Sequence, residues 1–520
     1  MSLEAAPSNV TRVRSWLRNV GCGYLDLATG ALIYVLLTPL LVRLLGIEAY
    51  AIWIISHTVT FYLGFLDLGI TQAQIRFHAR FAARGRRQAI TQLLATSASL
   101  LTMAGLSAAL IACAMAMSAP MQWLDVPETL TGDFRLVLVI LGINLLVAFP
   151  GSVLASAYEG AQRFDLAALR SIALRLLTAA AQFWSLQRGH GVVTLAALEL
   201  CASVLRLLFD LCVLPHLAPG ALREPVRRTA GIWKRMRSFA LWSSVDDLVV
   251  EGTAHLDQVL IAALLPLAML TPYSLCMSAG AILMVVVEPI VETFFPMAAG
   301  LHARGNKPEL RQLMLTGTKV VVAIATPIAI VLMFFGNAAL TLWIPEIESE
   351  LPTGLLQLIV ANMLVSVFMW TPNLVLMALN RVRAVAILTL VEVLLALVLI
   401  LVLVPSYGLA GIAAGALIAN ILAGLALQLP LVRAATGISV THLIVSALGR
   451  VSLASMPAVA VACWLAQSND SFTWLRLFAT TGAVGLTYVL GLLLYGFTRE
   501  ERDRYLRFAA ASLKTQPSES

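Results

Sequence analysis

The acidic residues that could do chemistry gather in one apolar segment. The stretch "WSSVDDLVVEGTAHLDQVLIAALL" (242–265) carries four carboxylates and a histidine among aliphatic residues. On a helix of about 3.6 residues per turn, Asp247, Glu251 and His255 recur every fourth position and share one stripe. Asp257 falls in the same half of the helix, and the opposite half holds no charge. One half therefore requires water or polar partners, while the other suits lipid or packed protein.

Two interpretations of this acidic stripe remain open. In the first, the helix lines a hydrated cavity, and Asp247, Glu251, His255 and Asp257 bind a coupling cation, either a proton or a sodium ion. In the second, the same groups form buried ion pairs with basic residues of neighbouring helices. We favour cavity lining because the stripe is long, and ionisable residues within a membrane commonly mark ion pathways. Glu288, in the next apolar segment, joins the same predicted cation-coupling group.

Basic residues lie inside apolar segments of the first half of the chain. Arg175 has no carboxylate within one turn of its own helix, and a guanidinium can hold two phosphate oxygens in its planar fork. We therefore predict that Arg175 binds phosphate, with Arg206 and Asp26 as further substrate-binding residues. The alternatives are an ion pair between Arg175 and Glu199 across two helices, and a local pair between Arg206 and Asp210, four residues apart on one helix.

A carboxylate also marks the end of the second apolar segment. The stretch "FYLGFLDLGITQAQIRFHAR" (61–80) passes from apolar to basic, and Asp67 lies at the transition. We predict that Asp67 and Arg76 form a gate, in which the carboxylate contacts arginines of the following loop. The alternative is a carboxylate at a helix end that is solvated together with its neighbours.

The composition indicates that these charged residues lie within helices that span a membrane. The chain has 520 residues, of which 60% are hydrophobic and 12% are charged, whereas a soluble domain is roughly 45–50% apolar and about 25% charged. A bilayer accommodates such a surplus, and each spanning helix needs about 20 apolar residues. We expect fourteen spans, at about 19–42, 49–71, 93–117, 136–157, 167–187, 192–215, 239–264, 271–298, 314–336, 355–379, 384–405, 409–432, 449–466 and 475–497.

The distribution of basic residues predicts the orientation of these spans. The net charge is +7, but most arginines and lysines lie in alternate loops, such as 76–87 and 223–237. The opposite loops include the acidic stretches "LDVPETLTGD" (124–133) and "IPEIESE" (344–350). This pattern follows the positive-inside rule, so it argues against a nucleic-acid partner and places both termini in the cytosol.

An internal repeat relates the two halves. Trp123 and Trp343 lie in corresponding loops about 220 positions apart, and Pro150 and Pro372 lie late in corresponding spans at nearly the same offset. Six spans per repeat give both halves the same orientation. The sequence thus predicts an all-α integral membrane protein of about 14 transmembrane helices, with two pseudo-symmetric six-helix lobes and a C-terminal helix pair. The expected parts are an interfacial segment (1–18), an N-lobe (19–216), a basic linker (217–238), a C-lobe (239–433), spans 13 and 14 (434–498) and a cytosolic tail (499–520).

The sequence offers no pattern typical of catalysis or metal binding. All six cysteines fall inside expected spans without the spacing of a disulfide or a metal site. We find no Ser/His/Asp or nucleotide-binding spacing, and the loops are too short for an extramembrane catalytic domain. We therefore expect no catalytic residues, no metal and no cofactor, and predict that the chain is not an enzyme.

Three motifs carry a resemblance to a known family. The stretches "LLGIEAYAIWII" (44–55), "FLDLGI" (65–70) and "YEGAQRFD" (158–165) resemble Wzx-type polysaccharide and O-antigen flippases of the MATE/MOP superfamily. Ala51 stands where that family usually has glycine. The resemblance is clearest over residues 10–180. It implies a MATE-like fold of two six-helix lobes in the bacterial inner (cytoplasmic) membrane.

The resemblance also implies a function. Flippases of this kind move an undecaprenyl-pyrophosphate-linked oligosaccharide across the inner membrane for the synthesis of lipopolysaccharide or exopolysaccharide, by alternating access coupled to an ion gradient. The implied partners are this lipid-linked oligosaccharide, a proton or sodium ion, membrane lipids and a polymerase or export complex. The alternative is a MATE-like antiporter of drugs or metabolite cations. A membrane glycosyltransferase and a non-transporting scaffold are more remote alternatives.

Overall fold

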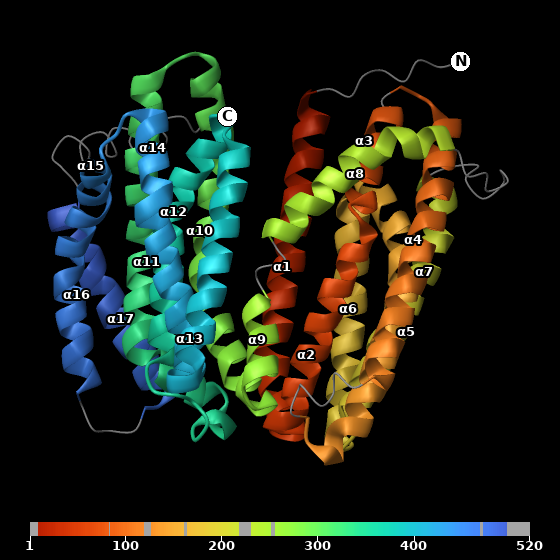
Figure 1. The fold of residues 1–520 in the computed structure, drawn as a ribbon, viewed down its shortest axis with the longest axis horizontal. Helices are drawn as coiled ribbons and strands as arrows, with labels where there is room; N and C mark the ends of the chain where they lie inside the picture. Colours follow the sequence, from red (N-terminus) through yellow and green to blue (C-terminus); the bar gives the residue numbers. More distant parts are fainter. Residues whose placement is uncertain are drawn as a thin grey trace, which may run out of the picture. The chain divides into compact units, whose positions relative to one another are not determined.

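The computed structural model describes residues 9–82, 84–118, 126–160, 164–217, 230–250, 255–467 and 472–496. Regular secondary structure in these residues is helical throughout, which confirms the all-α membrane class (Figure 1). The chain forms two compact units, residues 1–271 and 272–520. The expected C-lobe starts at residue 239, whereas the second unit starts at Pro272, so the segment between them packs with the first unit.

Nine helices of the described residues belong to the first unit. They are α1 (Asn9–Leu45), α2 (Ile47–Gly64), α3 (Ile70–Ala82), α4 (Arg87–Met117), α5 (Thr131–Gly160), α6 (Phe164–Gln187), α7 (Val192–Leu217), α8 (Ala230–Val250) and α9 (Leu256–Leu264). The second unit comprises nearly all of α10 (Leu270–Ala303), then α11 (Lys307–Trp343), α12 (Leu355–Ala378), α13 (Val382–Ala423), α14 (Leu429–Thr436), α15 (Val440–Ile444), α16 (Arg450–Ala466) and α17 (Trp474–Gly491).

Twelve helical segments of the described residues are long and apolar enough to cross a membrane. One of them, 383–436, covers two expected spans, because α13 turns at Gly408 (φ 53°, ψ −131°). After the turn the chain folds back on itself, so that Gly411 lies against Leu403 and Gly415 against Ile400. Glycine allows these two close backbone approaches.

The expected span at 239–264 differs from the observed structure. It falls on α8, on residues 251–254, which lie outside the described residues, and on the nine-residue α9. His255 is the N-cap of α9, with φ −116° and ψ 9°. This segment is therefore not one straight helix over its described residues, and it is absent from the twelve membrane-spanning candidates.

The internal repeat is visible in the helical elements themselves. A 3₁₀ turn begins just after Pro127 ahead of α5, and another begins at Pro345 ahead of α12. Both long helices contain a proline in their second half, Pro150 in α5 and Pro372 in α12. In each unit the helix also packs along the one before it, α4 with α5 and α11 with α12.

Helices α3, α4, α5 and α8 share a hydrophobic core in the first unit. Ile70 and Ala73 from α3, Leu101 from α4 and Val153 from α5 are buried together with Met236 from α8. Helices α3 and α8 lie together at one end of this unit (Figure 1). Large apolar side chains elsewhere remain exposed, as expected for surfaces that face lipid.

Candidate functional site

The predicted phosphate-binding residue Arg175 contacts the predicted substrate-binding residue Asp26. Arg175 lies on α6 and Asp26 on α1, and the Arg175 guanidinium donates a hydrogen bond to the Asp26 carbonyl oxygen at 3.1 Å. The same Nη1 atom lies 3.7 Å from the Asp26 carboxylate. The Arg175 side chain is 40% exposed, and its Nη2 also donates a hydrogen bond to the Ser171 hydroxyl at 3.5 Å. The expected alternative pair, Arg175 with Glu199, is wrong.

A glycine of α1 makes this contact possible. A Cβ atom built at Gly30 would lie 2.2 Å from Arg175 Nη1, far inside van der Waals contact. The guanidinium therefore lies directly on the backbone of α1, where it reaches the carbonyl of Asp26. Sequence reasoning assigned no role to Gly30, because its neighbour from α6 is about 145 residues away in the chain.

Glu199 lies beside a histidine that sequence reasoning missed. Its carboxylate, on α7, is 3.5 Å from His57 Nε2 on α2. The edge of the His57 ring packs against Trp53, with centroids 4.3 Å apart. Both His57 and Glu199 lie inside membrane-spanning segments. An ionisable residue in such a segment is a signal that could have identified His57.

A buried ion pair joins the ends of three helices. Both oxygens of Asp210 on α7 accept hydrogen bonds from Arg170 on α6, at 2.7 and 2.6 Å. Tyr158 on α5 donates a third at 3.0 Å, and burial together with the negative charge of Asp210 raises the pKa of the Tyr158 hydroxyl. The local pair expected between Arg206 and Asp210 is therefore not the ion pair observed, and the Arg206 side chain is exposed.

The predicted acidic stripe is only partly described. The backbone of Asp247 belongs to α8, but its side chain is not among the described parts of the chain. Glu251 lies outside the described residues. His255 shares the Gln258 side-chain oxygen with Thr58 of α2 and packs edge-on against Phe61. Asp257 accepts a hydrogen bond from the backbone N–H of Gln258 in the first turn of α9, where a carboxylate stabilises a helix.

The remaining predicted residues lie elsewhere. Glu288 is exposed on α10 in the second unit. Asp67 accepts a hydrogen bond from the Thr71 N–H at 3.2 Å and so caps the start of α3. It also lines a cavity of about 310 Å³ between α2, α3 and α8. Arg76, the other predicted gate residue, lies with its guanidinium over the Phe239 ring of α8 at 4.4 Å.

The "FLDLGI" motif fixes the approach of α8 to α3. Leu68 and Gly69 both have positive φ, 51° and 66°, where the chain turns from the end of α2 into α3. A Cβ at Gly69 would lie 2.2 Å from the Ala240 carbonyl oxygen of α8. Glycine is therefore required both for the backbone conformation and for the close packing of α8.

A family model described as polysaccharide biosynthesis protein matches residues 17–302, more than half of the chain. The chain belongs to the polysaccharide biosynthesis protein family. The matched part contains all three motifs of the sequence resemblance, together with Asp26, His57, Arg175 and Glu199. The family thus agrees with the resemblance read from these motifs.

Solved structures show the fold of this polysaccharide biosynthesis protein in other chains. The lipid II flippase MurJ in an inward closed conformation matches with a TM-score of 0.68 and 12% identity, over 91% of this chain and 99% of that one. An inward-facing multidrug resistance MATE family transporter of the MOP superfamily has a TM-score of 0.65 and 16% identity, over 78% and 96%. A MOP superfamily transporter from Pyrococcus furiosus has a TM-score of 0.56 and 16% identity, over 81% and 95%.

The search of curated proteins finds no match. Among the described residues of this family member, histidines, cysteines and carboxylates form no group of three or more that could hold a metal ion. The ionisable pairs Arg175–Asp26 and His57–Glu199 lie within membrane-spanning segments.

Proposed function

We propose that this protein translocates an undecaprenyl-pyrophosphate-linked oligosaccharide across the bacterial inner membrane for surface polysaccharide biosynthesis. The match to the polysaccharide biosynthesis family carries the proposal, and the fold shared with a lipid II flippase supports it. The protein is a multi-pass membrane protein and acts as a transporter rather than an enzyme. In this proposal both termini lie in the cytosol, and a polymerase or export complex receives the product.

The physical task explains why charged residues occur within apolar helices. A sugar and a pyrophosphate cannot cross bare hydrocarbon, because burying polar and charged groups without partners is prohibitive. Arg175 offers a guanidinium whose contact to the Asp26 carboxylate is long, at 3.7 Å. A pyrophosphate oxygen, which accepts stronger charge-assisted hydrogen bonds, exchanges for Asp26 as the partner of Arg175. Arg206, which is exposed on α7, supplies a second cation.

In this proposal an ion gradient drives transport. The residues that couple the two are those that change charge within the membrane. His57 and Glu199 lie 3.5 Å apart and can bind and release a proton as a pair. Asp247, Glu251, His255, Asp257 and Glu288 remain proposed cation-coupling residues, and Asp67 with Arg76 the proposed gate. One charge moved across 100 mV supplies about 2.3 kcal/mol, which drives alternating access in this proposal.

The deciding experiment is translocation in vesicles. Purified protein is reconstituted with a fluorescent undecaprenyl-pyrophosphate oligosaccharide, and the label in the outer leaflet is removed with an impermeant reagent. We expect wild-type protein to exchange the label between leaflets, while Arg175→Ala and Glu251→Gln slow it at least tenfold. Arg84→Gln, at an exposed loop position, is the matched loss of one charge and retains the wild-type rate. Unchanged rates in both variants remove the site assignment, and no exchange by wild type removes the function.

A cation antiporter is the competing function, because multidrug transporters share the fold. The same vesicles therefore receive a fluorescent organic cation with a pH or sodium gradient. Accumulation of the cation without oligosaccharide exchange favours the antiporter. For the coupling residues, we expect Glu199→Gln to abolish the dependence of exchange on the proton gradient.

A further inference from the structure

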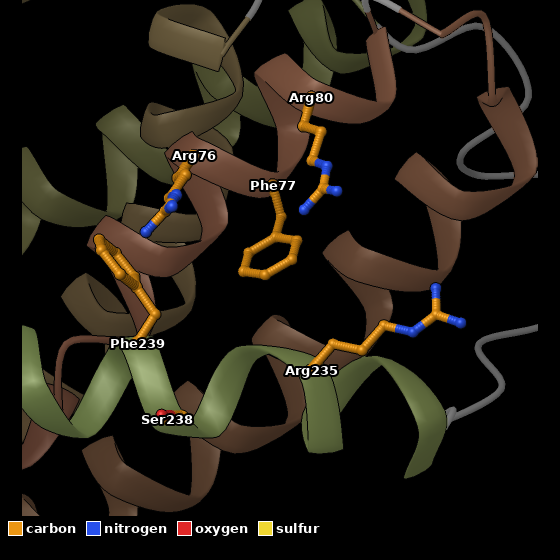
Figure 2. A pocket seen from close by; sticks show the side chains of 6 residues that line it. All are labelled: Arg76, Phe77, Arg80, Arg235, Ser238 and Phe239. Carbon is orange, nitrogen blue, oxygen red and sulfur yellow. The ribbon is translucent and has the colours of Figure 1, made fainter.

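A basic pocket lies between α3 and α8, away from the membrane-embedded pairs described above. Six residues line this α3–α8 pocket, which has a volume of about 380 Å³: Arg76, Phe77 and Arg80 from α3, and Arg235, Ser238 and Phe239 from α8. Figure 2 shows Arg76 and Arg80 on either side of Phe77, with Arg76 beside the Phe239 ring and Arg235 extending outward from α8. The volume falls at the small end of the range for ligand sites, roughly 300–1,000 Å³.

The two helices expose these residues because their other faces are buried. On α3, Gln74, His78 and Phe81 point into the protein, while Arg76 and Arg80 are exposed. On α8, Ile232, Met236 and Ala240 are buried in the same core, and Arg235 and Ser238 are exposed. The close approach at Gly69 holds the helices together. The packing therefore places three arginines from two helices in the lining of one pocket.

Among the described residues, the arginines of the α3–α8 pocket have no acidic partner. None of the six lining residues is acidic, and no described carboxylate forms an ion pair with Arg76, Arg80 or Arg235. Like charges that line one pocket repel one another, and an anion bound there lowers this repulsion. Guanidinium groups match phosphate oxygens in geometry and in charge.

The surroundings of the pocket define what kind of phosphate fits. Helix α3 connects two membrane-spanning segments, 47–67 and 88–117, so the pocket lies near the level of lipid headgroups. Phe77 and Phe239 add an apolar wall beside the arginines. A soluble anion has no apolar part that could contact these rings. A lipid presents a phosphate next to a glycerol or isoprenoid chain, which can pack against them. We propose that the α3–α8 pocket binds the phosphate group of a membrane lipid.

Two lipids carry this chemistry. An anionic phospholipid offers a phosphodiester, and a polyprenyl pyrophosphate offers two linked phosphates. The site exists in either case without any translocation, so it does not depend on the proposed function. Loss of transport activity and loss of lipid binding are separate results.

The test is lipid binding to the intact protein in a neutral detergent, measured by native mass spectrometry. The probes are phosphatidylglycerol, phosphatidylcholine, undecaprenyl pyrophosphate and inorganic pyrophosphate. The triple variant Arg76→Gln, Arg80→Gln, Arg235→Gln removes the pocket charge. The control triple Arg84→Gln, Arg86→Gln, Arg304→Gln removes the same net charge from exposed positions that do not line the pocket.

We expect the pocket triple to weaken binding of the anionic lipids at least tenfold, since each charge-assisted hydrogen bond lost accounts for about a factor of ten or more. The control triple binds like wild type. Preference for undecaprenyl pyrophosphate identifies a polyprenyl pyrophosphate as the ligand, and equal binding of phosphatidylglycerol identifies a general headgroup site. Equal losses in both triples, no loss in the pocket triple, or competition by inorganic pyrophosphate as strong as that of the lipids overturns the proposal.

Discussion

Asp210 binds the Arg170 guanidinium through both carboxylate oxygens, at 2.7 and 2.6 Å, and is only 1% exposed. Tyr158 adds a third hydrogen bond, and its ring lies 5.2 Å from the Arg170 guanidinium carbon. The three residues come from α5, α6 and α7, so the cluster joins three helices at one point. A carboxylate this deeply buried is tolerated because all of its charge is compensated by these partners.

Removal of the Asp210 charge should destabilise the protein strongly. Asp210→Asn leaves the Arg170 charge buried without its counter-charge, which costs about 3–5 kcal/mol in comparable buried pairs. Tyr158→Phe removes one hydrogen bond and costs about 1 kcal/mol. Thermal unfolding in detergent measures both, and Arg206→Gln on the same helix is the exposed control. Equal melting temperatures for Asp210→Asn and Arg206→Gln would show that the pair adds no stability.

The position of Gly30 allows the role of Arg175 to be tested without changing any charge. Gly30→Ala places a methyl group where Arg175 Nη1 now lies, at 2.2 Å, so the guanidinium must leave the Asp26 carbonyl. We expect the translocation rate to fall about tenfold while the protein remains folded. The readout is the vesicle exchange assay together with the melting temperature.

Gly482→Ala provides the control for this substitution. Gly482 also lies in a long apolar helix, α17, but a Cβ there meets nothing within 4 Å. It should leave exchange unchanged. If Gly30→Ala exchanges at the wild-type rate, Arg175 does not act from the position seen in the structure.

The burial of His78 predicts that the stability of the protein depends on pH. It is 3% exposed on α3, outside the membrane-spanning segments, and burial lowers its pKa below the usual 6.5. The unfolded chain therefore takes up a proton as the pH falls through about 6.5, while the folded protein does not. Stability that is present above pH 6.5 is lost as the pH falls toward the lowered pKa of the folded state.

The measurement compares melting temperatures between pH 8 and pH 5 for wild type and His78→Met. Methionine fills a similar volume without a titrating group. We expect the wild-type melting temperature to fall more steeply with decreasing pH than that of the variant. Parallel pH profiles for the two proteins would show that His78 does not titrate on unfolding.

Hydropathy and charge predicted the membrane class, and most spans agree with the observed helices, because desolvation acts on each segment locally. The contacts between charged side chains of different helices could not be predicted in the same way. Asp26 and Arg175 are about 150 residues apart, and only the packing of α1 against α6 brings them together. Sequence reasoning paired neither Arg170 nor Tyr158 with Asp210, which lies 40 and 52 residues further along the chain.

The acidic stripe shows the limit of periodicity. Placing Asp247, Glu251 and His255 on one face assumed an uninterrupted helix, but His255 has non-helical backbone angles and precedes α9. In the sequence, Gly252 and Thr253 precede His255, and both residue types disfavour helix. The residue types correctly indicated a polar segment within an apolar region. Their placement on one shared face required a continuous helix, which the sequence does not ensure.

The close contact between Gly69 and α8 predicts that a side chain at this position destabilises the protein. Gly69→Ala introduces a side chain at φ +66° and 2.2 Å from the Ala240 carbonyl oxygen, whereas Gly85→Ala introduces one at φ +63° with nothing within 4 Å. Both variants bear the left-handed penalty of about 1–2 kcal/mol, but only the first must displace α8, which adds about 1–3 kcal/mol of overpacking. We therefore expect a lower melting temperature for Gly69→Ala than for Gly85→Ala, with anionic-lipid binding to the α3–α8 pocket lost only in the former. Because the φ penalty is the same, equal behaviour of the two variants would mean that this glycine serves the turn alone and that α8 does not depend on it.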